Sequence, residues 1–163
     1  MNWTDVCSDN ALQDLPYKVE LDEWGQIVMR PASVRHVALQ DAIASLLKEL
    51  LKKVSRQGRV LQEFPVQIED SVRVPDVVWI SEDKFQRVKD QIASPLAPEI
   101  CVEVLSPGNT TARMARKKSR YFHAGVREVW TCDKTGAMAF FARSGELGRS
   151  NLVPDFPGWV GEL

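Results

Sequence analysis

The chain has 163 residues, of which 44% are hydrophobic and 26% are charged, as expected for one globular domain over residues 1–163 with a buried core. Its formal net charge of −1 excludes a polybasic protein that binds nucleic acid through its overall charge. No apolar run approaches the length of a membrane span, and the first ten residues lack the pattern of a signal peptide. Three cysteines, an odd number without metal-ligand spacing, predict a reducing, cytoplasmic setting.

The first half of the chain is predicted to contain a hairpin, a long helix and two more strands. A polar segment comes first, and Glu20 lies within the first strand of the hairpin. Apolar residues at 3–4 spacing predict the helix, which Ser33 can cap. The predicted elements are strand 17–21, strand 26–29, helix 34–56, strand 60–68 and strand 72–80.

The second half is predicted to contain a strand–helix–strand unit flanked by a short helix and a final strand. Thr110 is a suitable N-cap for the central helix, and Gly125 is a suitable left-handed C-cap. A unit of this length is a βαβ crossover or half of an α/β sandwich. The predicted elements are helix 81–91, strand 99–105, helix 110–124, strand 128–133 and strand 137–142.

Glu103 is unusual because it lies in the middle of an apolar strand. Alternation along residues 99–105 places it on the same face as Cys101 and Leu105. A carboxylate is costly to bury there unless it is paired or bound to a metal. Two interpretations follow from the strand alone: a residue at the strand edge that reaches solvent or an arginine, or a functional acid.

Two further residues extend this interpretation. Asp76 lies in strand 72–80, and Lys117 lies in the helix that follows Glu103. If the two strands are neighbours, the carboxylates of Asp76 and Glu103 can converge, and such a pair must share a proton or bind a cation. Oxygen ligands with open water positions suit Mg²⁺ or Mn²⁺, and a nearby ammonium can stabilise charge on a phosphate. This set of groups is typical of phosphodiester hydrolysis.

Three segments carry a resemblance to a known family: RVPDVVWIS, EICVEVLSPGN and KKSRYFHAGVREVW. In this order they resemble the PD-(D/E)XK nuclease superfamily and, more closely, the Uma2 family of restriction-endonuclease-like proteins. The resemblance spans nearly the whole chain, although Leu105 stands where the superfamily motif has its lysine. It implies an α/β fold with a mixed, curved central sheet flanked by helices and with the acids at one edge.

The resemblance also implies roles for individual residues. Asp76 and Glu103 match the metal-binding acids, and Glu20 matches an acid that joins them in many relatives. Lys117 matches a lysine that has moved from the strand to the helix. Periodicity disagrees, because the apolar stripe of the helix would point Lys118 inward and place Lys117 on its flank. Relatives tend to have an apolar residue at the position of Lys118, so we predict Lys117 as the catalytic lysine and keep Lys118 in reserve.

The implied function is a Mg²⁺-dependent endonuclease that hydrolyses DNA. Six Lys or Arg and no acid lie between residues 106 and 127, and Arg113, Arg116 and Lys118 among them are predicted to meet the phosphate backbone. Cleavage of both strands usually takes two sites, which predicts a homodimer. His36 is expected to be a capping or packed histidine. The alternative function is a non-catalytic nucleic-acid-binding or assembly module on the same fold.

Overall fold

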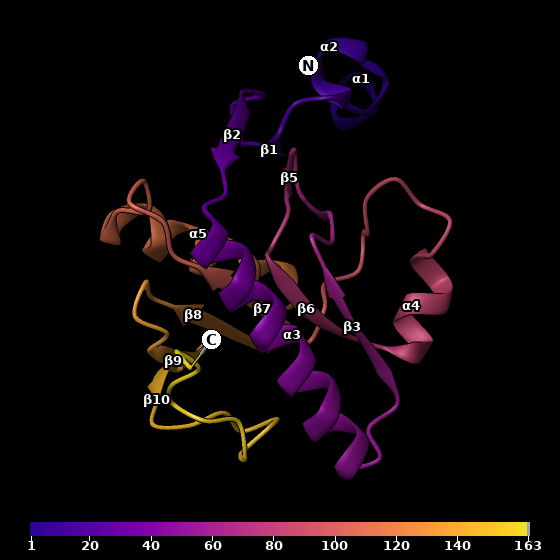
Figure 1. The fold of residues 1–163 in the computed structure, drawn as a ribbon. Helices are drawn as coiled ribbons and strands as arrows, with labels where there is room; N and C mark the ends of the chain where they lie inside the picture. Colours follow the sequence, from indigo (N-terminus) through magenta and orange to yellow (C-terminus); the bar gives the residue numbers. More distant parts are fainter. Residues whose placement is uncertain (163) are drawn as a thin grey trace.

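The chain folds into two β-sheets, with the two longest helices on opposite faces of the larger sheet and the short N-terminal helices beside the smaller one (Figure 1). The structure is a computed structural model that describes residues 1–162. Its elements are α1 Trp3–Ser8, α2 Asn10–Gln13, β1 Tyr17–Leu21, β2 Ile27–Pro31, α3 Val34–Lys53, β3 Gly58–Gln62, β4 Val66–Ile68, β5 Ser71–Arg73, β6 Val77–Ser81, α4 Glu82–Val88, β7 Ile100–Val104, α5 Thr111–Ala124, β8 Glu128–Cys132, β9 Met138–Ala142 and β10 Gly145–Leu147.

The larger sheet is mixed and has six strands in the order β10-β9-β8-β7-β6-β3. Its one parallel pair is β7 and β8, which α5 connects, and its other neighbours are antiparallel. Strands β6 and β7 are adjacent, with Val77 opposite Val102. The predicted mixed sheet and its strand–helix–strand unit are therefore present.

The two faces of this sheet carry separate hydrophobic cores. On the face that α3 crosses in Figure 1, Ile100 and Val102 of β7 pack with the apolar residues of that helix. On the opposite face, Cys101 packs with Tyr121 of α5. Because side chains alternate along a strand, Glu103 lies on the same face as Cys101 and points toward α5.

The smaller sheet has four antiparallel strands in the order β2-β1-β5-β4. Strands 60–68 and 72–80, each predicted as continuous, are both divided between the two sheets. The first breaks where Glu63 adopts a φ of 53° just before Pro65, and the second breaks at Pro75. Proline cannot donate to a ladder, so a change of sheet at these points is physically reasonable. Asp76 consequently lies at the junction between the sheets, immediately before β6.

The ends of the helices and strands show which capping and turn residues correctly predicted the element boundaries. Thr110 accepts a hydrogen bond from Arg113 N, and Gly125 closes α5 with a φ of 104°, as the sequence predicts. The predicted polar N-terminal segment is instead helical, because Asn2 and Asp5 form a capping box at the start of α1. The short strand β10 was not predicted. Among residues 1–162, no helix combines the length and the apolar character that crossing a membrane requires.

Candidate active site

Asp76 and Glu103 face a common cation, the ammonium of Lys18. Both carboxylate side chains are 1% exposed. Lys18 Nζ donates to Asp76 Oδ1 at 2.7 Å and lies 4.0 Å from Glu103 Oε2. Burial opposes the charge of Lys18, but the negative charges of Glu103, Asp76 and Glu20 outweigh it and raise the pKa of Lys18.

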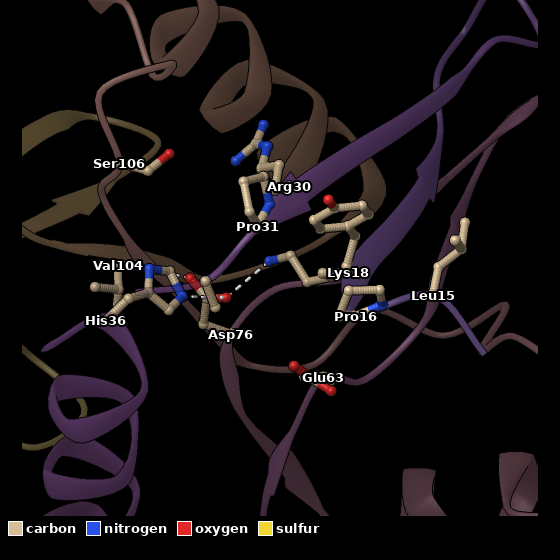
Figure 2. Close-up of a pocket in the computed structure, with 12 residues that line it drawn as sticks. Leu15, Pro16, Lys18, Arg30, Pro31, His36, Glu63, Asp76, Val104 and Ser106 are labelled. Carbon is tan, nitrogen blue, oxygen red and sulfur yellow. Dashed lines mark hydrogen bonds and ion pairs between the residues drawn. The ribbon is translucent and has the colours of Figure 1, made fainter. Parts of the chain in front are cut away.

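Asp76 is held from three sides. Its Oδ2 accepts a hydrogen bond from Val104 N at 2.7 Å, which ties it to the end of β7. Its Oδ1 lies 3.3 Å from His36 Nε2 as well as against Lys18, and Figure 2 shows both contacts. Burial favours the neutral acid, but hydrogen bonds and charges from His36 and Lys18 outweigh it and hold the pKa of Asp76 well below its usual value. Asp76 is therefore ionised at neutral pH.

Glu103 is positioned by α5. Its Oε1 lies 2.7 Å from Lys117 Nζ and accepts a hydrogen bond from the Tyr121 hydroxyl, also at 2.7 Å. Burial, followed by the nearby charge of Glu103, raises the pKa of Tyr121 well above its usual value, so the phenol keeps its proton and donates. The helix that follows β7 thus supplies two donors to the acid of that strand.

Glu20 reaches the same lysine from β1. Its Oε1 accepts a hydrogen bond from Val74 N at 2.8 Å and lies 3.1 Å from Lys117 Nζ. Arg30 and Arg73 each lie 3.8 Å from its Oε2. Burial would raise the pKa of Glu20, but the charges of Lys117, Lys18 and Arg30 outweigh it and lower that pKa to about 2. In this arrangement Glu20 contacts Lys117 more directly than it contacts the other acids.

A cavity of about 260 Å³ opens beside Asp76 (Figure 2). Lys18, Arg30 and His36 line it, together with Ser106 from the loop after β7. A phosphate group entering here would lie near the cations Lys18 and Arg30 and near the carboxylates of Asp76 and Glu63. Of the three acids of the site, Asp76 is the one that this cavity exposes to an approaching substrate.

The donor set fits a divalent cation shared by Asp76 and Glu103, because a positive group already lies between the two carboxylates. Among residues 1–162, no three His, Cys, Asp or Glu side chains are grouped as a complete metal site would group them. A hard cation such as Mg²⁺ keeps several waters and needs only one or two carboxylates from the protein. Lys18 would have to move aside to admit it.

The structure distinguishes the two candidate lysines. Lys117 is buried between Glu20 and Glu103, two of the acids with which the resemblance groups it. Lys118 instead lies over the ring of Phe141 at 3.5 Å from its centroid, outside the acidic cluster. The inward orientation that periodicity predicts for Lys118 is wrong, since an ion-paired lysine can occupy the buried face of a helix. Arg113 and Arg116 are exposed on α5.

Lys18 and His36 belong to this site, although the sequence argument gave neither a role in it. Ser33 caps the backbone of α3 by accepting from His36 N, which leaves the imidazole free to reach Asp76. Lys18 precedes Glu20 by two residues in one strand, so period-2 alternation places both on the same face. That spacing was the available signal for Lys18.

Comparisons with known proteins agree with this architecture. The Uma2 family model, described as "Putative restriction endonuclease", matches residues 10–158. The structure resembles the crystal structure of "a putative nuclease belonging to DUF820" from Anabaena variabilis ATCC 29413, with a TM-score of 0.66 and 20% sequence identity. That similarity covers 89% of this chain and 84% of the other chain, and at this identity it establishes a shared fold. No curated protein matches the sequence significantly.

Proposed function

Because the chain belongs to the Uma2 family of restriction-endonuclease-like proteins, we propose that it is a divalent-metal-dependent endonuclease that hydrolyses phosphodiester bonds of DNA. The observation that carries this proposal is the pair of buried carboxylates, Asp76 and Glu103, gathered around one cation and bordered by Lys117. Residues 1–163 would act as one nuclease domain, with Mg²⁺ or Mn²⁺ as cofactor.

In this proposal Asp76 and Glu103 would hold the cation, which would supply positive charge beside the phosphate and lower the pKa of a water. Glu20 remains a predicted third ligand. Its contacts also fit another role, because it neutralises and orients the Lys117 ammonium. Lys117 has three N–H donors, and its contacts with Glu20 and Glu103 fix the direction in which it can donate to a water or a phosphate oxygen.

The substrate would approach across α5 and the cavity beside Asp76. Arg113, Arg116 and Lys118 would neutralise backbone phosphates on the outer side of the helix. Two copies of the chain, related as a homodimer, would present two such sites to the two strands of a duplex.

The decisive experiment measures cleavage of plasmid and single-stranded DNA with Mg²⁺, with Mn²⁺ and with EDTA. We expect metal-dependent cleavage by the wild type and none by Asp76→Ala. Glu69→Ala, which removes an exposed acid outside the site, serves as the matched control and should cleave normally. Binding of DNA without cleavage under every condition would favour the non-catalytic module instead.

A further inference from the structure

A second cavity, of about 300 Å³, is lined by Lys117 and shares Arg30 with the cavity beside Asp76. We name it the Trp24 cavity. Five of the ten residues that line it are cationic, namely Arg30, Arg73, Arg113, Arg116 and Lys117. The first two come from the smaller sheet and the other three from α5, so two distant parts of the chain form one cationic wall.

The arginines of α5 give this wall its available positive charge. Within residues 1–162, neither Arg113 nor Arg116 has a carboxylate within ion-pairing distance, whereas Arg73 is already paired with Glu23 at 2.7 Å. The other acid in the wall, Asp22, accepts hydrogen bonds from the backbone of the hairpin turn. The outer part of the Trp24 cavity therefore favours an anion such as a phosphate.

The indole of Trp24 lines this cavity and remains accessible to solvent. It lies in the turn of the β1–β2 hairpin, and 66% of its surface is exposed. The guanidinium of Arg116 lies 5.6 Å from the centre of the ring. A large exposed aromatic ring beside unpaired arginines is what proteins use to stack a base and hold its phosphate.

We propose that the Trp24 cavity binds a nucleotide with an unpaired base, next to the phosphate that is cleaved. The base stacks on Trp24, and its phosphate is held by Arg113 and Arg116. This inference rests on the proposed nuclease function and narrows its substrate to a strand whose base is unpaired at this position, in single-stranded DNA or in a locally opened duplex. The narrowing follows because the bases of an intact duplex are stacked on each other, which leaves no free face for an indole.

The position of the Trp24 cavity fits a nucleotide that neighbours the cleaved phosphate. Lys117 lines the Trp24 cavity and also touches Glu103, and Arg30 lines both this cavity and the one beside Asp76. A strand that lies over Arg30 and Lys117 would therefore reach both cavities with neighbouring phosphates.

Fluorescence anisotropy in EDTA tests the proposal without cleavage, using a short labelled single strand of DNA and the duplex of the same sequence. We expect the single strand to bind more tightly, and Trp24→Ala to weaken single-strand binding by roughly tenfold while leaving duplex binding unchanged. Trp24→Phe keeps an aromatic face and should retain most of the affinity. Arg116→Ala should lower the salt dependence of binding by about one unit of slope, whereas Arg149→Ala, an exposed arginine outside the cavity, should not.

Equal affinity for single strand and duplex would overturn the proposal, as would unchanged binding by Trp24→Ala. The outcome is separable from that of the cleavage assay. Trp24-dependent binding without any metal-dependent cleavage would retain the cavity and reject the nuclease. Cleavage that requires Asp76 but is accompanied by Trp24-independent binding would retain the nuclease and reject this cavity.

Discussion

Lys18 is the direct counter-ion of Asp76, with its Nζ 2.7 Å from Asp76 Oδ1. The same ammonium lies 4.0 Å from Glu103, so one side chain offsets the repulsion between two buried carboxylates. A divalent cation held by these acids would have to take the place of that ammonium. Lys18 and the metal are therefore expected to compete.

Lys18→Met tests this competition. Removal of the ammonium should raise the affinity for Mn²⁺ by about tenfold or more, because the ion then no longer competes with a positive charge for Asp76 and Glu103. Without metal, the same change should lower the melting temperature, and saturating Mn²⁺ should restore it. Calorimetric titration and thermal unfolding measure both effects. Lys89→Met removes an exposed lysine at the end of α4 and should change neither. Weaker Mn²⁺ binding by Lys18→Met would show that Lys18 supports the metal site.

The free energy of unfolding below pH 4.5 should depend on the ionisation of Glu20. The pKa of Glu20 in the folded protein, about 2, lies below the ordinary value of 4.5, so the folded state stabilises the ionised carboxylate relative to the unfolded state. The resulting stabilisation is present above pH 4.5 and is lost as the pH falls toward 2. The shift corresponds to about 3 kcal/mol.

Urea unfolding of the metal-free protein across this pH range measures the loss. Glu20→Gln should be less stable than the wild type at neutral pH, because Lys117 loses a partner, and should lose less stability on acidification. Glu49→Gln, which removes an exposed acid of α3, should follow the wild-type curve. If Glu20→Gln and the wild type had parallel curves below pH 4.5, Glu20 would not be the group that titrates.

The sequence was sufficient for contacts that depend on local periodicity. Alternation along residues 99–105 placed Glu103 on the face of Cys101, which α5 covers in the structure, and Thr110 and Gly125 marked the ends of that helix. It was not sufficient for Lys18, whose importance depends on a partner 58 positions away in the chain. Periodicity also could not place Lys117, because a stripe of apolar residues does not reveal a lysine whose charge is neutralised inside the fold.

The oligomeric state is a separate prediction. One site cuts one strand, so cleavage of both strands by a small nuclease calls for two copies, and a closed two-fold dimer is the commonest way to provide them. We expect light scattering at micromolar concentration to report about twice the 18.4 kDa mass of the chain. A particle of 18.4 kDa that still converts plasmid to the linear form would contradict the dimer.

The two adjacent lysines of α5 provide the sharpest test of the site. Lys117 lies 2.7 Å from Glu103 and 3.1 Å from Glu20, and its side chain is 5% exposed. Lys118 has the same charge but contacts the ring of Phe141. Lys117→Ala should therefore lower turnover by roughly a hundredfold or more, the effect of losing one electrostatic stabiliser of the transition state. Affinity for Mn²⁺ should be unchanged or slightly higher, since a positive charge near the cation is removed.

Lys118→Ala is the matched comparison, and its effect on turnover should be milder. The substitution should lower the thermal stability, because Lys118 packs against β9. It should also reduce the salt dependence of DNA binding, because Lys118 is predicted to meet a phosphate. Single-turnover cleavage rates compare the chemical step in the two variants separately from their affinities for DNA. An inactive Lys118→Ala beside a fully active Lys117→Ala would move the catalytic role to the neighbouring lysine. Full activity in both variants would mean that neither ammonium takes part in the chemistry, and that the buried contacts of Lys117 with Glu20 and Glu103 serve folding alone.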